Sequence, residues 1–136
     1  MKMKLSAQKC VPCEGGVTPM SRKEAQRKLK EHASQLKKWR IALTKVKGKK
    51  ALALQKEYRF KKSLEGAKFC SQVWKAAERQ GHHPDIFLQY GKATVTWTTH
   101  AIKGLSMNDF IMASTTEEVY KRFQNSEEDK EAGLAV

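Results

Sequence analysis

The dipeptide Gly91-Lys92 constrains the fold more than any other feature, because it separates two short runs of alternating residues. The runs, 85–90 and 93–100, are rich in β-branched and aromatic residues, as strands commonly are. A two-residue connection with glycine first fits a type II′ hairpin loop. We therefore predict an antiparallel hairpin with Gly91-Lys92 as its loop, in which the two residues flanking the loop face each other.

A second hairpin is predicted upstream. Residues 39–45 alternate apolar with polar or small side chains, a turn follows at Gly48, and apolar residues recur over 51–60. Lys56 stands where the alternation calls for an apolar residue. This interruption predicts either a bulge or an exposed strand end at Lys56.

Three helices are predicted from apolar residues at helical spacing. The first opens with the capping box of Ser21 and Glu24, and Gly81 is a natural stop for the second. The third begins at Ser106, with Asp109 in the third position of a variant box. The expected ranges are 21–36, 63–80 and 106–123. The second helix is expected to turn inward Leu64, Ala67, Cys70, Trp74 and Ala77, widened by Phe69 and Val73.

The predicted order of elements is therefore α-β-β-α-β-β-α, which implies a two-layer α+β domain. Its four-stranded antiparallel sheet is expected to carry the three helices on one face, leaving the other for solvent or a partner. The domain spans 21–123. Residues 1–20 form an N-terminal arm, and 124–136 form an acidic tail that is predicted to be disordered.

The charge balance favours anionic partners without naming them. The chain has 27 basic and 14 acidic residues, a net charge of +13. A solvated surface explains this charge equally well. The aromatic residues mostly occupy periodic core positions, so nucleic-acid binding is expected to be weak and non-specific at most.

No apolar run is long enough to span a membrane. The basic start lacks the apolar stretch of a secretory signal, so we expect a cytoplasmic protein, with the nucleus as an alternative.

Cys10 and Cys13 form a CxxC pair. A zinc site needs a second pair of ligands at similar spacing, and Cys70 lies far away in the sequence. The pair precedes glycines rather than a helix, which argues against a redox motif. Its role is not defined by the sequence.

Three of the four histidines, His82, His83 and His100, fall in one short window. The predicted hairpin register places His83 opposite His100, and His82 follows the second helix beside them. Glu78 lies one helical turn before His82 and can reach the same end of the hairpin. Several imidazoles around one pocket can donate and accept protons near neutral pH, as the elimination of water requires.

Two other interpretations of the histidines stay open. A three-histidine zinc site is the sharper one, although adjacent His82 and His83 would normally diverge. The histidines could also be structural and cap the second helix. No serine or cysteine nucleophile motif and no glycine-rich phosphate loop accompanies them.

The histidine segment resembles the signature of the pterin-4a-carbinolamine dehydratases. Residues 78–84 match the family's ExxxHHP element, and Tyr90 follows at the family's usual spacing. Thr99-His100 matches a TH element, and 104–106 with Asp109 match GL[ST]xxD. The resemblance covers 21–123 and is strongest from residue 78 onward.

This resemblance implies an enzyme that dehydrates 4a-hydroxytetrahydropterin to the quinonoid dihydropterin, which recycles the cofactor of aromatic amino-acid hydroxylases. It implies no metal and no cofactor. Carried onto this chain, it implies that His82 and His100 transfer protons at the 4a-hydroxyl and ring nitrogen, and that His83 positions the pterin. The residues expected to be catalytic or to hold the substrate are Glu78, His82, His83, Pro84, Thr99, His100, Ala101 and Ile102.

The resemblance also bears on partners. Some members bind a homeodomain transcription factor, so a protein-binding regulatory module is a second hypothesis. The family's habit and the uncovered sheet face predict a homo-oligomer, either a dimer or a tetramer. The preferred side chain of the pterin is not defined by the sequence.

Overall fold

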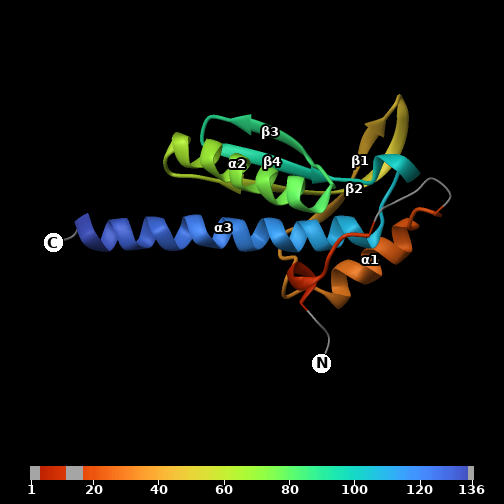
Figure 1. The fold of residues 1–136 in the computed structure, drawn as a ribbon, viewed down its shortest axis with the longest axis horizontal. Coiled ribbons are helices and arrows are strands. Elements are labelled where there is room, and N and C mark those ends of the chain that lie inside the picture. Colours follow the sequence, from red (N-terminus) through yellow and green to blue (C-terminus); the bar gives the residue numbers. More distant parts are fainter. Residues whose placement is uncertain (1–3, 12–16, 135–136) are drawn as a thin grey trace.

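The computed structural model describes residues 4–11 and 17–134, with side chains described as far as Gln124. Its long elements follow the predicted order α-β-β-α-β-β-α (Figure 1). Two short 3-10 helices, η1 and η2, are added to them. The elements are η1 (Leu5–Ala7), α1 (Arg22–Glu31), β1 (Arg40–Val46), β2 (Lys49–Arg59), α2 (Ser63–Gln80), β3 (Asp85–Gln89), β4 (Lys92–Trp97), η2 (His100–Ile102) and α3 (Met107–Leu134).

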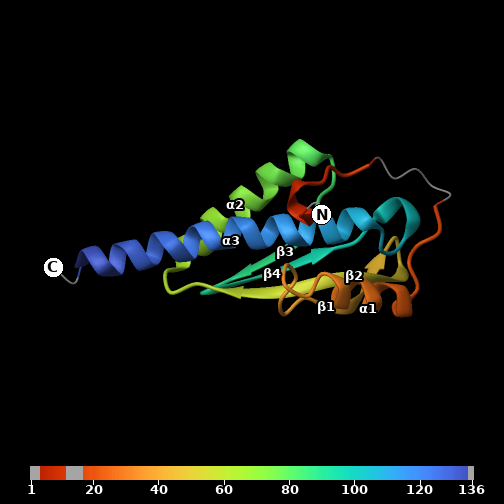
Figure 2. The same cartoon turned by 90° about the horizontal axis from the view of Figure 1, so that it is seen from below.

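The four strands form one antiparallel sheet in the order β1-β2-β4-β3. The long strand β2 pairs with β1 through its first half and with β4 through its second half. Helices α2 and α3 lie together on one face of this sheet, and α1 packs against β1 (Figure 2). The predicted α+β class with three helices and a four-stranded antiparallel sheet is confirmed.

The register of the β3–β4 hairpin differs from the prediction. Gln89 pairs with Lys92, so the loop is Tyr90-Gly91 and the glycine comes second. Gly91 has a φ of +76°, a conformation that glycine adopts without steric cost. The two-residue shift moves every cross-strand neighbour. Continued outward, this register brings Thr98, not His100, opposite His83.

Strand β2 is regular, and the predicted bulge or exposed end at Lys56 is wrong. Lys56 pairs with Val95 in an unbroken ladder, and its ammonium lies 2.7 Å from the carboxylate of Glu117 on α3. The Tyr58 hydroxyl donates a hydrogen bond to the same carboxylate. Burial, followed by the Glu117 charge, raises the pKa of Tyr58 above its usual range. The alternation of apolar residues along β2 is therefore interrupted at Lys56 because this residue forms an ion pair that links α3 to the sheet.

The helices begin largely where the sequence predicts. The capping box of Ser21 and Glu24 is present, and α2 has the predicted bounds, with Gly81 as its left-handed C-cap. Helix α1, however, ends at Glu31 rather than near residue 36. The chain turns there so that Leu36 and Trp39 can pack in the core.

The predicted inner face of α2 is partly wrong. Its core face consists of Phe69, Val73, Ala76 and Ala77, whereas Leu64 and Trp74 are 66% and 45% exposed. Helix α3 continues to Leu134, past the last apolar residue of its periodicity, and extends beyond the sheet in both views (Figures 1 and 2). The disorder of 124–136 stays a prediction. Within the described part of the chain, no helix combines the length and apolar character that crossing a membrane requires.

Candidate active site

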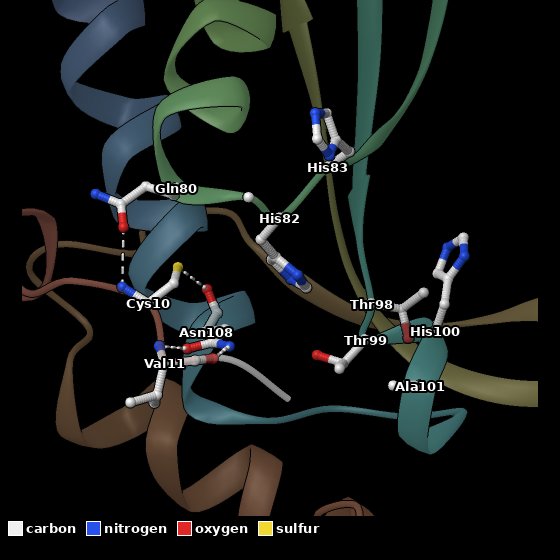
Figure 3. Close-up of a pocket in the computed structure, with 11 residues that line it drawn as sticks. Cys10, Val11, Gln80, His82, His83, Thr98, Thr99, His100, Ala101 and Asn108 are labelled. Carbon is white, nitrogen blue, oxygen red and sulfur yellow. Dashed lines mark hydrogen bonds between the residues drawn. The ribbon is translucent and has the colours of Figure 1, made fainter. Parts of the chain in front are cut away.

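A cavity of about 460 Å³ lies where the ends of α2, β4 and the start of α3 meet. Histidines contribute to it from two separate segments, and the N-terminal arm closes one side (Figure 3). The lining residues are Cys10, Val11, Gln80, Gly81, His82, His83, Thr98, Thr99, His100, Ala101 and Asn108.

Gly81 positions the first two histidines. Its φ of +66° ends α2, and the following amide of His82 still donates a hydrogen bond to the Ala77 carbonyl at 3.2 Å. This left-handed termination is the usual way for a helix to stop at glycine. The chain therefore leaves α2 in a fixed direction, with His82 and His83 at the mouth of the cavity.

His82 is held by a buried carboxylate on α3. Its Nε2 lies 2.7 Å from Oδ1 of Asp109, a residue with no exposed surface. The other oxygen, Oδ2, accepts hydrogen bonds from the Thr99 hydroxyl at 2.8 Å and the Ser106 amide at 2.9 Å. The imidazole also stacks on Trp97, with ring centroids 5.6 Å apart. The two donors to Asp109, the Thr99 hydroxyl and the Ser106 amide, fit an ionised carboxylate, which can only accept.

This arrangement defines the tautomer of neutral His82. Because the Asp109 carboxylate accepts, Nε2 of His82 carries the hydrogen, and the lone pair is on Nδ1. A histidine whose second nitrogen is held by a carboxylate is fixed in orientation, and the carboxylate stabilises the imidazolium that forms when Nδ1 takes up a proton. His82 can therefore act as a general base.

His83 is held more loosely. Its Nε2 lies 2.6 Å from Oε1 of Glu78, but the Glu78 side chain is 64% exposed and His83 is 38% exposed. The ring of His83 also contacts Trp74, at a centroid distance of 5.0 Å. An exposed pair of this kind has a smaller orienting effect than the buried pair of His82 and Asp109.

His100 enters the cavity from the opposite side, at the start of η2 (Figure 3). Thr99 and Gly104 form an isolated β-bridge that closes the short loop around η2. The His100 side chain is exposed and accepts or donates no hydrogen bond within the part of the chain that the structure describes. Its imidazole is therefore available to contact a ligand in the cavity that it lines together with His82.

The cavity unites most of the sequence-predicted site residues. His82, His83, Thr99, His100 and Ala101 all line it. Glu78 contacts it only through His83. Pro84 lines a second cavity instead, and Ile102 is 9% exposed and does not line the first.

Other residues of the site were not predicted. Asp109 was interpreted only as part of a helix start, although it belongs to the GL[ST]xxD element quoted above. Cys10, Val11, Gln80 and Asn108 also line the cavity, and their sequence carries no signal for this role. Cys13 lies outside the described residues.

Metal ligation was the main alternative for the histidines. Among residues 4–11 and 17–124, no three His, Cys, Asp or Glu side chains are grouped so that they could hold a metal ion. His82 and His83 direct their Nε2 atoms to different carboxylates, on α3 and α2 respectively. A metal-free reaction stays a prediction.

Together these features define a class of small α+β proteins with a histidine-lined pocket between two helix ends and one strand end. The chain belongs to the pterin 4 alpha carbinolamine dehydratase family, whose model matches residues 18–119. It is 40% identical over 119 residues to a provisionally named pterin-4-alpha-carbinolamine dehydratase 1 of Cupriavidus pinatubonensis, covering 88% of this chain and 94% of that protein. A provisionally named relative from Chlorobaculum tepidum is 40% identical over 110 residues, covering 81% and 92%.

A solved structure has a similar fold. The transcriptional coactivator/pterin dehydratase from Brucella melitensis superposes with a TM-score of 0.59 at 26% sequence identity. The match covers 75% of this chain and 98% of that one. The family predicted from the sequence is thus confirmed.

Proposed function

We propose that this protein dehydrates 4a-hydroxytetrahydropterin to the quinonoid dihydropterin and so recycles a tetrahydropterin cofactor. Membership of the family supports the reaction class. The observation that carries the proposal is the pairing of His82 with the buried Asp109 at the edge of an open cavity. A buried carboxylate that fixes one histidine tautomer is a feature of acid–base sites.

The reaction needs two proton transfers and no net proton. The C4a–O bond breaks, the hydroxyl leaves as water after it gains a proton, and the ring nitrogen loses a proton. In our proposal, His82 accepts the nitrogen proton at Nδ1. His100, which lines the cavity and has no hydrogen-bond partner among the described residues, delivers the proton to the departing hydroxyl.

His83 has a different role in this proposal. Its carboxylate partner, Glu78, is largely exposed, and its ring is flanked by Trp74. These contacts favour a group that holds the substrate over one that exchanges protons with it. His83→Ala should therefore raise KM more than it lowers kcat.

The test is a dehydration assay on freshly generated 4a-hydroxytetrahydropterin. His82→Ala and His100→Ala should each lower kcat by about 10²–10⁴-fold while the fold survives. His32→Ala is the matched control, because His32 caps α1 and does not line the cavity. Activity that is lost on chelation and restored by zinc would contradict the metal-free mechanism. Mutants that stay active and only melt earlier would show that the histidines are structural.

We also propose that the protein is a homo-oligomer, either a dimer or a tetramer. Strand β3 is an edge of the sheet, and its Phe87 and Leu88 are 63% and 45% exposed. An exposed edge strand with large apolar side chains is a surface that proteins usually cover. Light scattering that finds only monomer at micromolar concentration would refute this. A cytoplasmic location stays a prediction.

A further inference from the structure

Trp74 is a large side chain on α2 that the hydrophobic core does not use. It is 45% exposed and lies outside the core face of this helix. Its indole instead contacts a histidine of the site: the ring centroids of Trp74 and His83 are 5.0 Å apart, and the ring planes are inclined at 51°. The position of Trp74 therefore concerns the site rather than the core.

A second residue of α2 contacts the same imidazole. Glu78 follows Trp74 by four residues, so the two side chains lie on one face of the helix, one turn apart. Oε1 of Glu78 lies 2.6 Å from Nε2 of His83. Because the Glu78 side chain is 64% exposed, this hydrogen bond alone fixes the imidazole only weakly. The indole supplies the second contact that the orientation of the ring needs.

The backbone of His83 is restricted separately. His83 lies where the chain passes from α2 to β3, and Pro84 follows it (Figure 3). A proline confines the residue before it to extended backbone. Pro84 also lines the second cavity together with Trp74, so the indole lies alongside the segment that carries His83. The freedom that remains to His83 is the rotation of its side chain, and Trp74 and Glu78 both act on that rotation.

The orientation of His83 decides which nitrogen a ligand can meet. Because the Glu78 carboxylate accepts, Nε2 of neutral His83 carries the hydrogen and Nδ1 keeps a lone pair. His83 lines the site cavity, and its side chain is 38% exposed. Nδ1 is therefore the ring nitrogen that can accept a hydrogen bond from an N–H group of a ligand, and a pterin ring carries such groups.

We propose that Trp74 is a positioning residue: its indole holds the His83 imidazole in the orientation in which this histidine binds the pterin. This role rests on the proposed function, in which His83 holds the substrate. Trp74 acts through His83 and not on the reacting atoms. Loss of this positioning weakens the binding of substrate and transition state alike, so it changes KM and leaves kcat nearly unchanged.

Trp74→Ala is the central test, in the dehydration assay. An aromatic contact of this kind changes an equilibrium by roughly threefold to tenfold, and we expect KM to rise by about that factor, with kcat within about twofold of the wild type. Trp74→Phe keeps an aromatic ring and should restore most of the lost affinity. Leu64→Ala is the matched control, because Leu64 is an exposed apolar residue of the same helix and lines neither cavity. An unchanged KM in Trp74→Ala would overturn the proposal.

A double variant tests whether Trp74 acts through His83. Adding Trp74→Ala to His83→Ala should raise KM no further, because the group to be positioned is already absent. A further rise as large as that in the wild-type background would overturn the proposal, since the indole would then act independently of the histidine.

A measurement on the free protein separates this proposal from the proposed function. The three-bond couplings between Hα and the two Hβ atoms of His83, measured by NMR, report whether its side chain occupies one χ1 rotamer. We expect unequal couplings in the wild type and in Trp74→Phe, and averaged couplings in Trp74→Ala. Averaged couplings already in the wild type, or unequal ones in Trp74→Ala, would overturn the proposal. If the wild type shows no dehydration, the proposed function fails, and the couplings alone decide whether Trp74 positions His83.

Discussion

Asp109→Asn is the substitution that most directly probes how the site works. The side chain keeps its size but loses its charge, and it sits where there is no exposed surface. The amide oxygen can still accept from Thr99 and Ser106, as the Oδ2 of Asp109 does. The amide nitrogen must then face His82 and donate to it.

The expected effect on catalysis follows from the tautomer. A donor facing Nε2 of His82 forces the hydrogen onto Nδ1, the atom that should accept a proton. A comparable inversion in another histidine–aspartate pair lowers kcat by about 10⁴-fold. We expect kcat to fall by about 10²–10⁴-fold, with KM much less affected.

The effect on stability is smaller and can be measured separately. Hydrogen bonds to a charged acceptor contribute roughly 1 kcal/mol more than neutral ones, so the two retained bonds together lose about 2 kcal/mol. Urea denaturation should show a free energy of unfolding lower by about that amount. The protein should therefore remain folded and nearly inactive.

The assay compares the wild type, three single variants and one double variant in the same dehydration experiment. Asp85→Asn is the matched control, because Asp85 is exposed and does not line the site cavity. Adding Asp109→Asn to His82→Ala should cost almost nothing further, since the two residues act as one unit. A kcat for Asp109→Asn within about threefold of the wild type would refute the tautomer argument.

Four further outcomes are expected. Gly104→Ala should lower the free energy of unfolding by about 1–3 kcal/mol, because the new Cβ would lie 2.6 Å from the Pro19 Cβ; unchanged urea denaturation would contradict this. Lys56→Met should lower the free energy of unfolding by about 3 kcal/mol in the same assay, because Glu117 would lose the cation with which it is paired. The side chains of this pair are only 11% and 16% exposed. An unchanged free energy of unfolding would show that the pair is dispensable. Burial raises the pKa of the Cys70 thiol, so less of it is present as thiolate at pH 8. Alkylation of Cys70, followed by mass spectrometry, should therefore be slower in the folded than in the unfolded protein. Equal rates would contradict the raised pKa. Binding to double-stranded DNA should be weak and should fall steeply with salt, whereas tight binding at physiological salt would overturn that expectation.

The elements of the fold could be predicted because their signals are local. Helix α2 has its predicted bounds, since Gly81 stops it unambiguously. The hairpin register could not be predicted, because the position of Gly91 within a two-residue loop changes the pairing without changing the alternation of the strands. The exposed Trp74 was placed inward for a similar reason: spacing alone does not show that a large side chain contacts His83 beside the site.

The residues of the site could be predicted only where side chains of one reactive type lie close together in the sequence. Three histidines in one window indicated the cavity, even though the predicted pairing of His83 with His100 was wrong. Asp109 has two compatible roles, as a helix-start acceptor and as the partner of His82, and sequence shows only the first. The contact of Val11 with Asn108 depends on tertiary packing across the whole domain, which no local pattern encodes.

The stacking of His82 on Trp97 has an optical consequence. Trp97 is fully buried with its indole N–H bonded to Thr116, whereas Trp74 is half-exposed beside His83. The two indoles therefore emit from different surroundings, and each adjoins a different histidine of the cavity. Pterins absorb in the near ultraviolet where tryptophan emits, so a pterin bound as in the proposed function should quench the emission of the nearby indoles by energy transfer. A loss of tryptophan fluorescence when a pterin is added would therefore report occupancy of the cavity without any label.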